Sequence, residues 1–194
     1  MKTIAVFDFD GTLTTRDTLI EFIRFAFGST RTYLGFLLYS PMILLMMLGI
    51  MDNNRCKELL LSHFFKGMEY SRFQQLGKEF ANIVPSFLRT EMVEQLKEHL
   101  QSGADVYVIS ASVEEWVKPF CMTLGVNDVL ATRLAVDANG LLTGKYNGKN
   151  CHGEEKVNRL KLVAPARNTY KLYAYGDSSG DSNMFAFADH YRKI

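Results

Sequence analysis

The chain has 194 residues, of which 47% are apolar and 22% charged, and its formal net charge is +1. These values are ordinary for a globular protein with one core domain and a small accessory one, and they give no electrostatic reason to expect a nucleic-acid partner. The three widely spaced cysteines predict reduced thiols in a cytoplasmic protein and argue against a disulfide framework or a zinc site. No secretory signal is expected at the N-terminus.

The first apolar segment ends in two carboxylates. Residues 4–8 predict a buried strand, and Asp8 and Asp10 stand two residues apart in the run AVFDFDGTLT. Side chains two apart in a strand point to the same side. With Gly11 and Thr12, these carboxylates offer ligands for a hard cation, a nucleophile and a proton shuttle. The alternative is a strand followed by an acidic turn, since Asp and Gly are common turn residues.

A long helical insertion is predicted from about residue 15 to 85, and its middle carries no charge between Arg31 and Asp52. The uncharged stretch is long enough for a membrane helix, but a single crossing would put Asp8 and the later polar groups on opposite sides of a bilayer. Because Ser40-Pro41 interrupts the stretch, we expect two short helices with a bend, each too short to span.

Residues 33–51 have two interpretations. They form either a helix pair that packs on the core or in a dimer, or a hairpin that lies in a membrane surface as a peripheral membrane contact. Basic residues on both flanks fit the second interpretation, with both ends on the cytoplasmic side. The sequence leaves the oligomeric state open.

Strands and helices alternate in the second part of the chain. The pattern predicts helices over 91–102, 114–124, 154–162 and 182–188, strands over 105–110, 129–132 and 171–175, and a hairpin from 134–136 and 141–146. This alternation predicts an α/β fold with a doubly wound parallel sheet.

Polar residues recur at the ends of these apolar runs. Ser110 ends DVYVIS, Lys156 opens KVNRLKLV, and Asp177 and Asp181 lie in GDSSGD after KLYAY. Each also has a plain structural interpretation: Ser110 as a helix N-cap, Lys156 on a solvated helix face, and GDSSGD as a loop. Their order along the chain, after the two N-terminal carboxylates, favours one shared site at the strand ends.

DFDGTLT, VISAS, the Lys156 element and GDSSGD together resemble the four motifs of the haloacid-dehalogenase (HAD) superfamily. The resemblance runs from Ile4 to about Ala188 and is closer to the phosphoserine-phosphatase-like subfamily. CHGEEKV, the SAS string and the apolar insertion resemble phosphatidylglycerophosphatase C-type members. The resemblance implies a Rossmann-like core made of residues 1–14 and 86–194, with a helical cap inserted over residues 15–85.

The resemblance also implies a Mg²⁺-dependent phosphomonoester hydrolase. Asp8 would attack phosphorus to form an aspartyl-phosphate, and Asp10 would serve as general acid and base. Asp8, the Asp10 carbonyl group and Asp177 would hold the cation. Asp181 would support the cation's water shell or orient Lys156.

Phosphoryl oxygens would be bound by Ser110 and Lys156, and by backbone groups of Gly11, Thr12 and Ala111. Asp17 is the candidate substrate contact, since it stands where phosphoserine phosphatases usually carry a longer Glu. Ala111-Ser112-Val113 replaces their Gly-Gly-Phe run, and Gly180 replaces an Asn. These departures leave the hydrolytic chemistry intact but argue against phosphoserine as the substrate. The apolar side chains of residues 33–51 favour instead an acyl-chain-bearing substrate such as phosphatidylglycerol phosphate.

Other functions stay open at this point. One is a phosphoserine phosphatase or another small-metabolite phosphatase. Another is a phosphotransferase or mutase, which would shield the aspartyl-phosphate from water. A receiver-like phospho-signalling domain is disfavoured by the large insertion, and a membrane-interaction protein with an inactive core is disfavoured by the complete set of polar groups.

Overall fold

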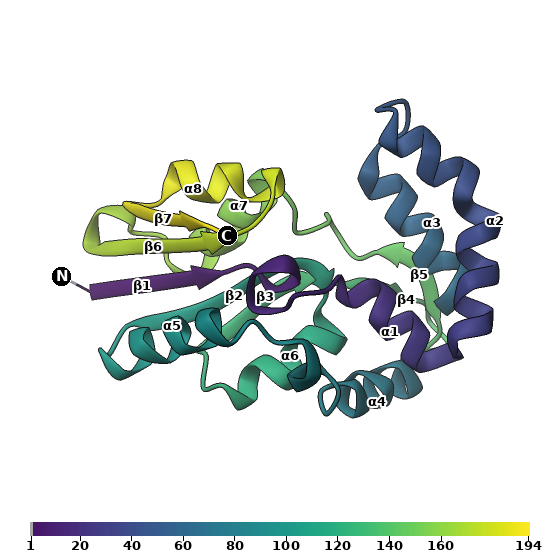
Figure 1. Ribbon diagram of the computed structural model, residues 1–194, viewed down its shortest axis with the longest axis horizontal. Helices are drawn as coiled ribbons and strands as arrows, with labels where there is room; N and C mark the ends of the chain where they lie inside the picture. The colour runs from purple at the N-terminus through teal and green to yellow at the C-terminus, as the bar shows by residue number, and fades with distance from the viewer. Residues whose placement is uncertain (1) are drawn as a thin grey trace.

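The computed structural model describes residues 2–194 and contains a central sheet of five parallel strands in the order β3-β2-β1-β6-β7 (Figure 1). The strands are β1 (Lys2–Phe7), β2 (Asp105–Val113), β3 (Asp128–Thr132), β6 (Tyr170–Gly176) and β7 (His190–Lys193). The predicted α/β fold with a parallel doubly wound sheet is confirmed.

Helices cover both faces of this sheet (Figure 1). They are α5 (Thr90–Gln101) and α6 (Glu114–Thr123) on one face, and α7 (Glu154–Val163) and α8 (Ser182–Phe187) on the other. Along β1, Ala5 and Phe7 join the apolar cluster under α5 and α6, whereas Ile4 and Val6 join the cluster under α7 and α8. Because β1 is central and apolar on both faces, it fixes the position of the polar residues that follow it.

Strand β7 was not predicted. All four of its residues are exposed, so the segment lacks the apolar alternation that marks a strand. It is the edge strand of the sheet and is held there by backbone pairing with β6, so its side chains contribute little to its folding as a strand.

Four α-helices lie between β1 and α5, at the carboxyl end of the sheet (Figure 1). They are α1 (Thr18–Phe27), α2 (Ser29–Met47), α3 (Asn53–Phe65) and α4 (Tyr70–Phe80). The hairpin of β4 (Leu134–Val136) and β5 (Leu142–Tyr146) packs against α3, where Glu58 accepts a hydrogen bond from the Tyr146 amide at 3.0 Å. The division of the chain into a core and a cap over residues 15–85 stays a prediction.

The predicted break at Ser40-Pro41 is wrong, because α2 continues unbroken to Met47. A proline at position 41 has no N–H for the carbonyl oxygen of Leu37, four residues earlier. The Ser40 hydroxyl donates to that oxygen at 2.8 Å and so replaces the missing bond. The chain turns later, over residues 48–52. Within residues 2–194, no helix is both long and apolar enough to cross a bilayer.

Candidate active site

The carboxyl ends of β1, β2 and β6 meet at the sheet edge that faces the inserted helices. Phe7 pairs with Val108 on one side and with Tyr175 on the other. Asp8, Ser110 and Asp177 lie one or two positions beyond this row. Parallel pairing therefore brings together residues that are far apart in the sequence.

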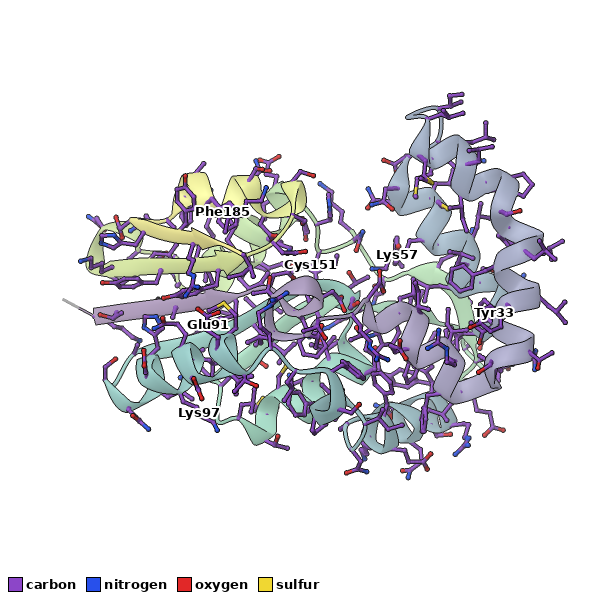
Figure 2. All side chains as sticks on the ribbon, in the orientation of Figure 1. Tyr33, Lys57, Glu91, Lys97, Cys151 and Phe185 are labelled. Atoms are coloured by element: carbon purple, nitrogen blue, oxygen red, sulfur yellow. The ribbon has the colours of Figure 1, made fainter. Side chains whose placement is uncertain are left out.

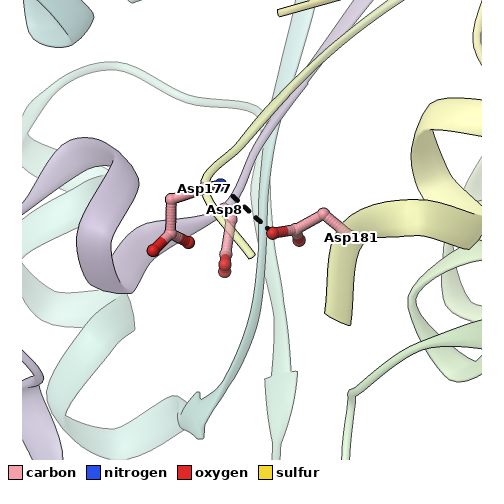
Figure 3. A group of neighbouring side chains, drawn as sticks. All are labelled: Asp8, Asp177 and Asp181. Carbon is pink, nitrogen blue, oxygen red and sulfur yellow. Dashed lines mark hydrogen bonds between the residues drawn. The ribbon is translucent and has the colours of Figure 1, made fainter. Parts of the chain in front are cut away.

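Three carboxylates form an acidic cluster at this edge (Figure 3). Asp8, Asp177 and Asp181 each place one oxygen so that the three atoms lie within 4.8 Å of one another. Burial raises the pKa of Asp8 to about 7, and burial followed by the charge of Asp181 raises the pKa of Asp177. Crowded carboxylates whose charged forms are destabilised in this way suit a hard divalent cation, which prefers carboxylate oxygens.

Lys156 is a buried ammonium group held between two carboxylates. It lies in the first turn of α7 with 2% of its surface exposed, so the solvated-face interpretation is wrong. Its Nζ is 2.9 Å from Asp8 Oδ1 and 2.5 Å from Asp181 Oδ1. Burial alone would lower the pKa of Lys156, but these two charges raise it. An ammonium group has three N–H donors, so one remains for a ligand.

The two oxygens of Asp8 have different surroundings. Oδ1 accepts hydrogen bonds from the Phe9 amide at 2.7 Å and from Lys156. Among residues 2–194, no hydrogen bond is made to Oδ2. The carboxylate is therefore held by one oxygen while the other stays open for reaction.

Asp181 shapes the loop that carries Asp177. Its Oδ2 accepts from the amides of Asp177 and Ser178 at 3.2 and 3.1 Å, and from the Ser178 hydroxyl at 3.1 Å. A Cβ on Gly176 would lie 2.5 Å from Asp181 Cγ, so the Asp181 side chain can lie this close to the backbone only because residue 176 is glycine. Since its Oδ1 accepts a hydrogen bond from Lys156, both oxygens of Asp181 are engaged in positioning Lys156 and the loop that carries Asp177.

Gly11 is needed both for backbone conformation and for space. Its φ is +73°, and a Cβ there would lie 2.1 Å from Asp177 Oδ2. Its carbonyl oxygen accepts from Arg89 at 3.0 Å. The adjacent Thr12 is fully buried, and its hydroxyl has no hydrogen-bond partner within residues 2–194.

The carboxylate of Asp10 is not part of the acidic cluster and is held by Thr18 and Ser112. Its Oδ1 accepts from the amide and the hydroxyl of Thr18 at 2.7 and 2.6 Å, and its Oδ2 accepts from the Ser112 hydroxyl at 2.5 Å. The buried Trp116 indole donates to the Thr18 hydroxyl at 3.1 Å. These contacts fix the orientation of the Asp10 carboxylate.

A bulge in β2 places the serines that follow it. Pairing with β3 shifts register between Ser110 and Val113, and the Ser110 hydroxyl accepts from the Ser112 amide at 3.0 Å. Ser110 is not a helix N-cap, because α6 has Val113 in that position. Lys57 of α3 reaches this bulge and donates to the Ala111 carbonyl oxygen at 2.9 Å. Figure 2 shows Lys57 where α3 approaches the core.

Asp17 is the N-cap of α1 and accepts from the Leu19 amide at 2.9 Å. Burial of the Asp17 carboxylate and the nearby charge of Asp10 raise the pKa of Asp17, while the charge of the Lys57 ammonium group lowers it. It therefore lies at the edge of the site and not within the acidic cluster.

Sequence reasoning missed four residues of this arrangement: Thr18, Lys57, Arg89 and Ser112. Ser112 had a usable signal, because it stands two positions after Ser110 and can share its side of a strand. The other three reach the site through tertiary packing of the inserted helices and the segment after them, which no local pattern marks.

The family model of haloacid dehalogenase-like hydrolases matches residues 5–186. The protein CicA of Caulobacter vibrioides is 33% identical over 189 residues, covering 96% of this chain and 83% of CicA. The probable phosphatase Rv3661 of Mycobacterium tuberculosis is 30% identical over 200 residues, covering 97% of this chain and 67% of that protein.

Two solved structures share the fold. A Bordetella pertussis protein of unknown function superposes with a TM-score of 0.84 at 19% identity, covering 98% of this chain and 89% of that one. A substrate-bound phosphoserine phosphatase superposes with a TM-score of 0.69 at 24% identity, covering 98% and 85%. The resemblance to phosphatidylglycerophosphatase C stays a prediction. The chain belongs to the haloacid dehalogenase-like hydrolase family, is a phosphatase of that family, and has the fold of its phosphoserine-phosphatase-like members.

Proposed function

We propose that the protein is a Mg²⁺-dependent phosphomonoester hydrolase that forms an aspartyl-phosphate on Asp8. The observation that carries this proposal is the asymmetry of Asp8, whose Oδ1 is held by Lys156 and a backbone amide while Oδ2 is open. Asp8, Asp177 and the Asp10 carbonyl group would hold the Mg²⁺, which when bound offsets the repulsion between an anionic nucleophile and an anionic substrate.

The reaction begins with Asp8. Its Oδ2 attacks phosphorus, so that a new P–O bond forms as the bond to the leaving oxygen breaks. The free N–H of Lys156 and the Ser110 hydroxyl would bind the phosphoryl oxygens.

Asp10 then moves the protons. It protonates the leaving oxygen, and it later takes a proton from the water that hydrolyses the aspartyl-phosphate and regenerates Asp8. The hydrogen bonds from Thr18 and Ser112 would hold its carboxylate in position for both steps. Ordering by these two hydroxyl groups supports the acid–base assignment of Asp10.

An aryl phosphate with Mg²⁺ tests this proposal. The wild type should turn over, excess chelator should abolish turnover, and Asp8→Asn should lower it by at least about 10³-fold. Asp105→Asn, a carboxylate at the opposite end of β2, is the matched control and should keep its turnover. Near-native activity of Asp8→Asn, or of the wild type in chelator, would contradict the mechanism.

We further propose that residues 15–85 form a cap that selects a lipid phosphate, such as phosphatidylglycerol phosphate, and that residues 33–51 contact a membrane surface. Helix α2 supports this idea, because it turns its small residues inward. A Cβ on Gly35 would lie 2.3 Å from Phe64 Cζ. Six of its large apolar side chains are instead 57–75% exposed: Tyr33, Leu34, Leu37, Leu38, Leu44 and Met47. Figure 2 shows Tyr33 on this outer side.

An amphipathic helix in water would carry polar side chains on this exposed face. A cytoplasmic location at the inner face of the membrane would also fit the three free, buried cysteines. The alternative substrates are phosphoserine and other small metabolites. In that case the exposed apolar face of α2 would pack against another protein chain and not against a membrane.

Replacing Leu44, Leu45 and Met47 with Ser separates these possibilities. The lipid proposal requires weaker binding to anionic liposomes and slower hydrolysis of lipid phosphates, with aryl-phosphate turnover retained. Leu162→Ser, on the exposed side of α7, is the control and should keep liposome binding. A wild type without liposome affinity that loses a dimer on triple substitution would contradict the proposal.

A further inference from the structure

A cavity of about 220 Å³ lies between α1, α2 and α3. Its wall is mostly apolar and comes from all three helices, with Leu19, Phe36, Ile43, Met46 and Leu60 among the lining residues. The charged members of the wall are Asp17 and Lys57. The cavity is therefore an apolar space with charge at its border.

The packing of α2 explains why the space exists. Gly35 lets α2 approach α3 closely beside Phe64. Nearer the turn at residues 48–52, Ile43 and Met46 are only half-buried on the inner side of α2. Leu60 of α3 is buried, yet these side chains leave a volume unfilled. The cavity is partly open to solvent, so an apolar group that enters it leaves water, which favours binding by about 0.8 kcal/mol for each buried CH₂.

The charged border of the cavity adjoins the reacting groups. Lys57 donates to the Ala111 carbonyl oxygen at 2.9 Å, next to Ser110 in β2. Asp17 directly precedes Thr18, whose amide and hydroxyl hold the Asp10 carboxylate. A leaving oxygen protonated by Asp10 therefore lies close to the border of the cavity, and the carbon chain attached to that oxygen can enter it.

We propose that this cavity binds an alkyl chain of the leaving alcohol, so that the enzyme prefers phosphomonoesters whose alcohol carries several consecutive methylene groups. The inference rests on the proposed phosphatase function and adds to it the place where the substrate's apolar part is held. It is independent of whether the outer face of α2 contacts a membrane, because the cavity faces α1 and α3.

A series of n-alkyl phosphates from ethyl to decyl tests the inference, each assayed as the monomer below its critical micelle concentration. For the wild type, kcat/KM should rise about fourfold for each added CH₂ and then level off once the cavity is filled. In Leu60→Phe, which narrows the cavity from α3, the rise should stop at a shorter chain. Ile43→Phe narrows it from α2 and serves as the second variant if Leu60→Phe does not fold.

The control is Leu38→Phe, the same change on the outer face of α2, where Leu38 is 66% exposed. It should keep the wild-type dependence on chain length. A flat profile in a wild type that hydrolyses ethyl phosphate would overturn the inference and leave the phosphatase function intact. A rise that neither cavity variant shortens would also overturn it, because the chain would then be bound elsewhere. No hydrolysis of any ester or of an aryl phosphate would instead reject the phosphatase function.

Discussion

The Lys156 ammonium group lies 2.5 Å from Oδ1 of Asp181, and both side chains are buried. The other oxygen of Asp181 holds the loop after β6, so this ion pair connects α7 to the segment that carries Asp177. The same ammonium group contacts Asp8 at the end of β1. The Lys156 ammonium group thus connects the chain segments that carry Asp8, Asp177 and Asp181.

Removing the Lys156 ammonium group should destabilise the fold. Lys156→Met leaves two buried carboxylates without compensation, and the free energy of unfolding in chelator should fall by about 3–5 kcal/mol. Mg²⁺ should restore part of this loss. Urea denaturation measures both effects, with Lys161→Met on the exposed side of α7 as control. An unchanged unfolding midpoint for Lys156→Met in chelator would show that the ion pairs do not stabilise the site.

The Ser112 hydroxyl should matter for proton transfer. Ser112→Ala removes a hydrogen bond to the Asp10 carboxylate, a contact worth about 1.5–3 kcal/mol, so turnover should fall roughly 10- to 100-fold. Alkyl phosphates should lose more than aryl phosphates, since an alkoxide leaves only when it is protonated. Steady-state assays on both classes, with the exposed Ser102→Ala as control, measure this difference. Equal losses on both classes would place Ser112 outside the proton-transfer step.

His99 should make stability depend on pH. It packs against Tyr175, with Nε2 2.7 Å from the hydroxyl oxygen, and burial lowers its pKa. The folded protein then binds this proton more weakly than the unfolded chain. The contribution of His99 to stability is complete above about pH 6.5 and is lost as the pH falls toward the folded pKa.

Thermal denaturation at several pH values tests this coupling. His99→Gln should flatten the fall in stability below about pH 6.5, whereas His190→Gln on the exposed edge strand should not. If the wild type and His99→Gln lose stability in parallel as the pH falls, the loss is caused by the protonation of a group other than His99.

Much of the fold could be predicted because its signals are local. Apolar β1, β2 and β6 alternate with helices, and this alternation was sufficient for the parallel sheet. Strand β7 could not be found, since none of its side chains is buried. The continuity of α2 also escaped prediction, because it depends on the Ser40 hydroxyl bonding the oxygen that Pro41 leaves free.

The site was predictable where its residues follow strands. Asp8, Ser110 and Asp177 lie at strand ends that parallel pairing brings together, and Lys156 follows from its place at the start of a helix. The direction of the Asp10 side chain was not predictable, because it depends on Thr18 and Ser112, which approach from α1 and from the β2 bulge. Their roles in the reaction remain predictions.

The central claim is that phosphate is transferred to Asp8, and trapping the intermediate tests it most directly. In Asp10→Asn the nucleophile remains but the base that activates water is removed, so a phosphoryl enzyme should accumulate with an aryl phosphate and Mg²⁺. After a rapid acid quench, peptide mass spectrometry should find one phosphoryl group on the peptide that holds Asp8, and neutral hydroxylamine should remove it. The double variant Asp8→Asn/Asp10→Asn should carry none. A phosphoryl group on Ser110, or none on any peptide while Asp10→Asn still turns over, would contradict the account.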